Sequence, residues 1–155
     1  IRPSEWTDNA IPSGASLAVE VLLKFSIILD EQVFRDIATK ILASMVKLVE
    51  QFPSASGQWL NAIDFYTSNH PEITIVGSKS DKGTQNLLNQ VYKTYIPNKI
   101  LVGLNNENNS ISNLAFTKYK QAIANKPTVY LCQNYECDLP TNDPEILSKQ
   151  LLDIK

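Results

Sequence analysis

The stretch Ile73-Thr74-Ile75-Val76-Gly77 decides the fold, because three of its residues are β-branched and apolar and a glycine ends it. This composition predicts a short buried strand. Residues 84–95 follow with apolar side chains at helical spacing and predict a helix, which Pro97 ends. Residues 99–104 then read as a second strand. A strand, a helix and a strand joined over about twenty residues favour a right-handed parallel crossover.

The chain beyond the second strand is expected to complete the same unit. Residues 105–113 are rich in Asn and Ser and predict a flexible surface loop. A short helix is expected near residues 116–124, and residues 128–132 predict a third strand. A final helix begins at Asp143 or Pro144 and carries the apolar residues Ile146, Leu147, Leu151 and Ile154.

Three helices are expected before the first strand. The first covers residues 17–29, and Asp30 is a plausible cap for the second, which continues to Phe52. The apolar band of this second helix is wide for an exposed helix, so we expect it to pack against more than one layer. The third helix covers residues 56–67, and its expected apolar side consists of Trp59, Leu60, Ile63 and Tyr66.

The apolar period changes near His70, which predicts an α+β chain in two parts. Residues 1–70 form the helical part. Residues 71–155 form a small three-layered α/β unit with about three strands.

The overall composition narrows the possible partners and location. The 155 residues include 14 basic and 16 acidic side chains, so a net charge of -2 disfavours nucleic acid and anionic membranes as partners. No apolar stretch approaches the roughly 20 residues that span a bilayer, and no signal peptide opens the chain. Two cysteines favour a reducing compartment, so we expect a cytoplasmic protein. Because Ile1 is not an initiator Met, we expect a portion of a longer protein.

Residues able to carry catalysis are scarce. His70 is the single histidine, which disfavours a Ser-His-Asp triad and excludes multi-histidine metal sites. Cys132 and Cys137 have four residues between them and lack the redox spacing of two intervening residues. We favour a structural pair of free thiols, with a disulfide or redox-responsive pair and metal binding as alternatives. No cofactor and no metal site is predicted, and catalytic residues stay unassigned.

Two loops offer polar groups for a ligand. Residues 77–84 join a strand to a helix N-terminus, where backbone amides can bind an anion, but they lack the Gly-Lys-Ser/Thr ending of a phosphate-binding loop. The opening loop combines Trp6, Asp8, Asn9 and Ser13, a mixture suited to a sugar or another polar ligand. The competing interpretation is structural: Asp8 and Ser13 cap the following helix while Trp6 covers its end.

Four stretches carry a resemblance to a known family. They occur in family order as Asp8-Asn9-Ala10-Ile11-Pro12-Ser13-Gly14-Ala15-Ser16, Glu72-Ile73-Thr74-Ile75-Val76-Gly77, Tyr95-Ile96-Pro97-Asn98-Lys99 and Val129-Tyr130-Leu131-Cys132-Gln133-Asn134-Tyr135-Glu136-Cys137-Asp138-Leu139-Pro140. Together they resemble the carboxy-terminal end of the thioredoxin-domain-containing, spermatogenesis-associated protein 20-like family. One position departs from the family pattern, because Ala15 stands where the family usually has Asn.

The resemblance implies a larger architecture. By this resemblance, the complete protein is expected to have a thioredoxin-like domain, then an (α/α)6 toroid similar to that of N-acylglucosamine 2-epimerase, and then a small α/β tail. Residues 1–70 would be the last toroid helices and residues 71–155 the tail, so the remainder of the parent chain is the expected partner. A second copy of the chain is a further candidate to cover exposed apolar helices.

Two functions follow as hypotheses. In the first, the opening loop contributes to a toroid cavity for a carbohydrate-like or other polar ligand. In the second, the chain is a structural or interaction module of a redox protein and performs no catalysis of its own. Fold similarity to epimerases does not establish an activity for the parent.

Overall fold

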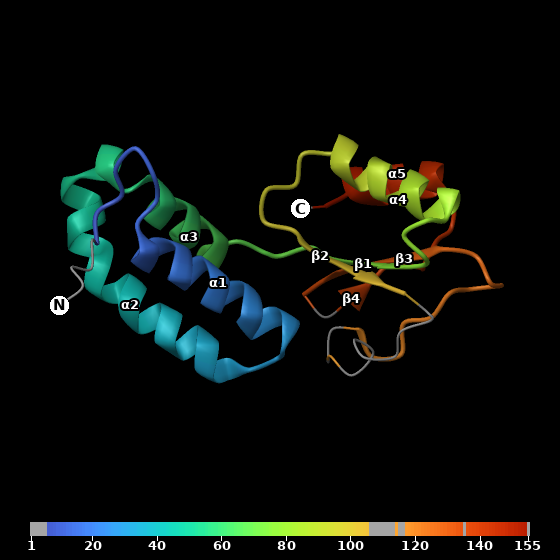
Figure 1. Ribbon diagram of the computed structural model, residues 1–155, viewed down its shortest axis with the longest axis horizontal. Coiled ribbons are helices and arrows are strands. Elements are labelled where there is room, and N and C mark those ends of the chain that lie inside the picture. Colours follow the sequence, from blue (N-terminus) through green and yellow to red (C-terminus); the bar gives the residue numbers. More distant parts are fainter. Residues whose placement is uncertain (1–5, 106–113, 115–116, 135, 155) are drawn as a thin grey trace. The chain divides into compact units, whose positions relative to one another are not determined.

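The computed structural model describes residues 6–105, 114, 117–134 and 136–154. The chain divides into two compact units, Ile1–Ser68 and Asn69–Lys155, which we call the helical unit and the sheet unit. Helices and a four-stranded mixed sheet among the described residues confirm the predicted α+β class (Figure 1).

Residues 6–68 of the helical unit, which the structure describes, contain three α-helices and one short 3-10 turn. They are α1 (Gly14–Ile28), α2 (Gln32–Gln51), η1 (Pro53–Ala55) and α3 (Gly57–Thr67). Ser13 caps α1 by accepting a hydrogen bond from the Ser16 N–H at 3.1 Å, so the helix begins three residues before the predicted start. The expected role of Asp30 was wrong. Its φ of 55° lies in the left-handed region and separates the two helices, while Glu31 occupies the N-cap position of α2.

The core of the helical unit contains one face of each helix. Its buried apolar residues are Val19, Leu23, Ala38, Leu42, Met45, Val49, Trp59, Ala62 and Phe65. The predicted face of α3 was partly wrong, because Leu60 is 42% exposed while Ala62 and Phe65 are buried. Trp59 fixes this rotation of α3: its ring is fully buried, and its indole N–H donates to the Trp6 carbonyl at 2.7 Å.

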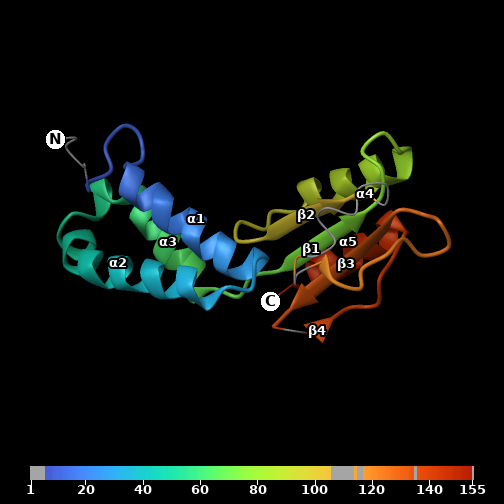
Figure 2. The same cartoon turned by 60° about the horizontal axis from the view of Figure 1, so that its bottom comes forward.

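The described residues of the sheet unit form four strands and two α-helices. They are β1 (Glu72–Val76), α4 (Lys82–Lys93), β2 (Ile100–Leu104), β3 (Thr128–Gln133), β4 (Glu136–Cys137) and α5 (Pro144–Leu152). The strand order is β2-β1-β3-β4, with β4 outermost beside β3 (Figure 2). β1 and β2 are parallel, as the crossover predicted, whereas β3 runs antiparallel to both β1 and β4. The two residues of β4 are too few to show a strand period, which is why the sequence did not predict this strand.

Both helices of the sheet unit lie on the same side of its sheet (Figure 1). Their shared core consists of Ile73, Ile75, Leu87, Val91, Ile96, Val129, Leu131, Leu147 and Leu151. The described residues of this unit therefore form two layers, one of helices and one of strands, and the expectation of three layers was wrong. Side chains alternate along a strand, so Glu72 and Thr74 of β1 and Tyr130 and Cys132 of β3 point to the opposite side of the sheet.

The helix predicted near residues 116–124 is wrong for the part that the structure describes. Tyr119 and Ala124 have φ values of 67° and 52°, which an α-helix does not accommodate, and Ile123 forms an isolated bridge with Lys126. Of the predicted loop 105–113, residues 106–113 lie outside the described residues.

Candidate functional site

Asp8 is the centre of the predicted opening-loop site. Its Oδ1 accepts hydrogen bonds from the Ser13 N–H at 2.8 Å and the Ser16 hydroxyl at 2.7 Å. Its Oδ2 accepts from the backbone N–H groups of Gln58 at 2.8 Å and Trp59 at 3.1 Å. The carboxylate therefore joins the start of α1 to the start of α3, where anions are stabilised by unpaired amides and the helix dipole.

The environment of Asp8 keeps it ionised. Burial raises the pKa of the carboxyl, but hydrogen bonds from Ser13, Ser16, Trp59 and Gln58 outweigh burial and lower the pKa below 3.8. Four donors from the chain itself occupy both oxygens, so Asp8 has little capacity left for a ligand. The sequence suggested that Asp8 caps the helix that follows it. Its contacts with α3, fifty residues away, had no local signal.

The other three predicted residues surround this carboxylate in different ways. Ser13 is buried and caps α1, and Asn9 is exposed, with its side-chain oxygen accepting from the Ala10 N–H at 2.9 Å. Trp6 is 46% exposed while its carbonyl accepts from the Trp59 indole. The structure thus brings all four residues to one end of the helical unit, with Trp6 and Asn9 the two that solvent reaches.

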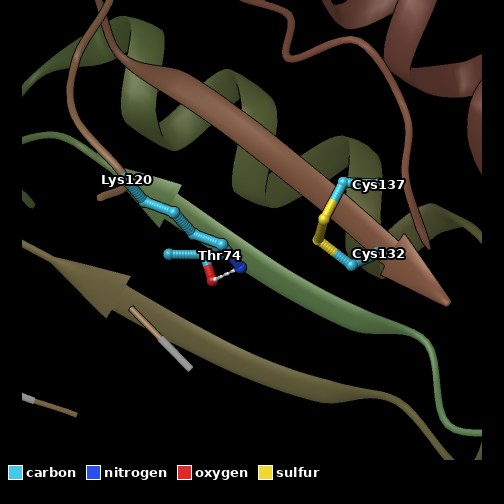
Figure 3. Close-up of a disulfide and its surroundings, with 4 residues drawn as sticks. All are labelled: Thr74, Lys120, Cys132 and Cys137. Carbon is cyan, nitrogen blue, oxygen red and sulfur yellow. Dashed lines mark hydrogen bonds between the residues drawn. A yellow bond between two sulfur atoms is a disulfide. The ribbon is translucent and has the colours of Figure 1, made fainter. Parts of the chain in front are cut away.

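The two cysteines form a disulfide between β3 and β4 (Figure 3). The favoured prediction of free thiols was wrong, and the alternative of a disulfide is the one that the structure has. Cys132 and Cys137 are register partners in an antiparallel pair with their Cα atoms 3.9 Å apart. The Asp138 N–H donates to the Leu131 carbonyl beside them at 2.9 Å, which makes this a non-hydrogen-bonded pair, the closer of the two types. Cys132 is buried and Cys137 is exposed.

A half-buried lysine, Lys120, lies on the side of the sheet that α4 and α5 leave open. Lys120 Nζ donates to the hydroxyl of the fully buried Thr74 at 3.1 Å (Figure 3). Burial lowers the pKa of Lys120, and the Glu72 carboxylate offsets only part of that effect. Glu72 is the register partner of Cys132, so the lysine, the carboxylate and the disulfide share one side of the sheet. Sequence reasoning missed Lys120, whose partner Thr74 is 46 residues away.

The strand-to-helix loop predicted as a weak anion site contains its own anion. The Asp81 carboxylate caps α4 by accepting from the Thr84 N–H at 3.1 Å. An incoming phosphate would meet this negative charge at the helix N-terminus, which disfavours a nucleotide there. His70, the single histidine, for which the sequence disfavoured a catalytic role, is half-buried in the segment between α3 and β1.

The described part of the chain offers neither a cluster of metal ligands nor a membrane-spanning helix. Residues 6–105, 114, 117–134 and 136–154 contain no group of three or more His, Cys, Asp or Glu side chains placed to hold a metal ion. Within the same residues, no helix combines the length and the apolar character needed to cross a membrane.

Comparison with known proteins gives one consistent result. No protein-family model matches the chain, and no solved structure matches it. Human spermatogenesis-associated protein 20 is 26% identical over 153 residues, which cover 97% of this chain and 20% of the human protein. The rat protein of the same name is 27% identical, with 97% and 19% covered. The chain thus spans about a fifth of the length of these relatives, and similarity along nearly all of it supports a spermatogenesis-associated protein 20-like family.

Proposed function

We propose that this chain is a structural and interaction module of a longer spermatogenesis-associated protein 20-like protein, and that its helical unit packs against further helices of that protein. The observation that carries the proposal is a second apolar face on α1. Its first face contains Val19 and Leu23, which are 0% and 1% exposed in the core.

The second face of α1 consists of Leu17, Val21 and Phe25, which we call the α1 stripe. These residues are spaced four apart and therefore form a line along the helix, and they are 43%, 47% and 45% exposed. A helix that is apolar on opposite sides is typical of the interior of a larger helical structure. α2 also exposes Val33 and Ile37, which adds apolar area to the unit.

The length of the relatives supports further helices of the same protein as the partner of the α1 stripe. Since the chain corresponds to about a fifth of them, a complete protein of this kind has ample sequence for neighbouring helices. The resemblance noted above suggests that these helices form an (α/α)6 toroid, preceded by a thioredoxin-like domain. In this proposal the chain supplies the last helices of the toroid and the α/β tail, and performs no catalysis alone.

Substitution of Val21 by Glu tests the proposal. At a half-exposed position of the isolated chain we expect a loss of about 0.5 kcal/mol or less in the free energy of unfolding. In the complete protein the same charge would be buried without a partner and cost roughly 2–3 kcal/mol. Ser44→Glu places the same charge on an exposed position of α2 and serves as the control. Equal small losses for Val21→Glu in both proteins, measured by chemical denaturation, would refute the proposal.

Binding of a polar ligand by the opening loop is the second candidate. Exposure of the Trp6 ring near the polar Asn9 supports it, because an aromatic face and an amide are groups that bind sugars. Trp6→Ala in the complete protein should weaken binding of whichever sugar a broad panel identifies. Asp8→Ala should weaken it too, but through loss of the loop structure. A panel in which no sugar binds would eliminate this candidate.

A further inference from the structure

We infer that the Cys132–Cys137 disulfide is a thiol–disulfide exchange site, which a dithiol reductant opens while the sheet unit stays folded. The two sulfurs differ in access. Cys132 is 5% exposed on β3, whereas Cys137 is exposed on β4, an edge strand of the described sheet. A thiolate from solvent therefore reaches Cys137 first.

The position of the disulfide separates it from the helix-covered core. Cys132 points to one side of the sheet, while its neighbour Leu131 points to the other and packs with the residues of α4 and α5. Breaking the sulfur–sulfur bond removes no side chain from that core. We therefore expect opening of the hairpin without unfolding of the unit.

Hydrogen bonds retain the segment after β4 when the disulfide is open. The Asp138 N–H donates to the Leu131 carbonyl at 2.9 Å. Thr141 and Val129 exchange two backbone hydrogen bonds, of 2.8 and 3.1 Å. Among the described residues, the freed part is thus limited to Asn134 and β4, so the two thiols stay close enough to form the disulfide again.

The exchange balances as a two-electron reaction. A reductant thiolate attacks Cys137 Sγ, the bond between the two sulfurs breaks, and Cys132 leaves as a thiolate that takes up a proton. The second thiol of the reductant then attacks the mixed disulfide and releases Cys137 as a thiol. The reductant is oxidised to its disulfide, and the chain gains two electrons and two protons.

The same geometry favours a dithiol over a monothiol. After the first attack, the Cys132 thiolate remains beside the mixed disulfide on Cys137, since their Cα atoms are 3.9 Å apart in the intact pair. It can attack again and expel a monothiol before a second molecule arrives, because the intramolecular reaction has a high effective concentration. A dithiol competes, since its own second thiol is also held at the site.

The experiment treats the oxidised full chain with dithiothreitol or with glutathione at equal thiol concentration, then counts alkylated cysteines by mass. Dithiothreitol should release two thiols at least about tenfold faster than glutathione. Among the described residues, amide exchange should increase only at 133, 134, 136 and 137, with β1 and α4 unchanged. If thiols appear only at the rate at which β1 and α4 amides exchange, opening requires global unfolding and the inference is wrong. Two free thiols in the chain after air oxidation would also overturn it.

Two serine variants provide matched controls that separate access from reactivity. In Cys132→Ser, the remaining Cys137 should form a stable mixed disulfide with glutathione disulfide, because no second thiol can expel the glutathione. In Cys137→Ser, the buried Cys132 should react at least about tenfold more slowly in the native chain. Equal reaction rates for the two variants would contradict the proposed entry at Cys137. Thermal unfolding followed by circular dichroism confirms that each variant is folded.

Discussion

Asp8 illustrates how a residue that looks like a ligand-binding group can be structural. Its carboxylate accepts four hydrogen bonds, two from the Ser13–Ser16 turn and two from the first turn of α3. Bonds to an ionised group are among the stronger ones in proteins, and the donors would be left without partners if it were removed. The main role of Asp8 is therefore to hold the opening loop and α3 together.

Asp8→Asn should lower the free energy of unfolding of the helical unit by roughly 2 kcal/mol at pH 7, because an amide cannot accept from all four donors. The pKa of Asp8 is lowered below 3.8 in the folded chain, so its stabilisation is complete above that pH and is lost as the pH falls further. The difference between the wild type and Asp8→Asn should shrink on acidification below about pH 4. Both tryptophans, Trp6 and Trp59, lie in the helical unit, so fluorescence during urea denaturation measures it.

Asp36→Asn is the control for this titration, since Asp36 is an exposed carboxylate that accepts a single side-chain bond from Gln32. It should change stability by less than about 0.5 kcal/mol at any pH. A constant difference between Asp8→Asn and the wild type from pH 7 to pH 2.5 would contradict the assigned role of the charge.

The contribution of the disulfide to stability can also be tested at the residue scale. Replacing both Cys132 and Cys137 by Ser should lower the stability of the sheet unit by about 2 kcal/mol, the chain-entropy value for so short a loop. Calorimetry of the variant, the oxidised chain and the reduced chain measures this. The reduced wild type should match the double variant, and a reduced chain as stable as the oxidised one would show that the cross-link contributes nothing.

At the scale of elements, the turn from β1 into α4 depends on a glycine. A Cβ on Gly77 would collide with the Thr84 hydroxyl of α4 and lie 3.1 Å from Cβ of Pro127. The strand, the first turn of the helix and the segment before β3 therefore meet at this residue. The sequence indicated only that Gly77 ends the strand, because the Pro127 contact joins residues fifty positions apart.

Gly77→Ala should destabilise the sheet unit by about 1–3 kcal/mol through overpacking. Gly103→Ala is the control, because nothing lies within 4 Å of its Cβ position, and we expect it to be neutral or slightly stabilising. Thr84→Ala removes the colliding hydroxyl, which is buried without a hydrogen-bond partner, and should recover part of the loss. Amide exchange of β1 and α4 reports these changes, and equal effects of Gly77→Ala and Gly103→Ala would contradict the contact.

At the scale of the whole molecule, each of the two units has its own apolar core. Trp59 and Phe65 are buried within the helical unit, whereas Ile73 and Leu147 are buried within the sheet unit. A unit with its own core can fold without the other.

Residues 69–155 alone should therefore keep the secondary structure that they have in the 155-residue chain. Circular dichroism and amide exchange of β1 and α4 in this fragment test the expectation. Within the 155-residue chain, Asp8→Asn should shift the unfolding transition that tryptophan fluorescence reports. It should leave the amide exchange of β1 and α4 unchanged. A fragment without protected amides in β1 would show that its fold depends on the helical unit.

Much of the fold followed from local patterns. The apolar period placed α1, α2 and α4, and the strand–helix–strand order gave the parallel pairing of β1 with β2, because these features depend on residues close in the chain. The buried face of α3 did not follow from its own period, since Trp59 had to meet Trp6 across 53 residues. In the described part of the helix expected near residues 116–124, left-handed residues such as Tyr119 interrupt the helix, and Lys120 joins the segment to Thr74 of β1, 46 residues away.

For the candidate sites too, local patterns predicted some features, and contacts between distant segments decided the others. Residue types and spacing were enough to single out Asp8, Ser13 and the two cysteines, because caps and cysteine pairs have short-range signatures. Whether the sulfurs are joined, what Asp8 binds and where Lys120 lies depended on contacts between distant segments. Local residue patterns do not encode contacts between segments that are far apart in the chain. They arise only when the sheet places β4 beside β3 and packing brings α3 to the opening loop.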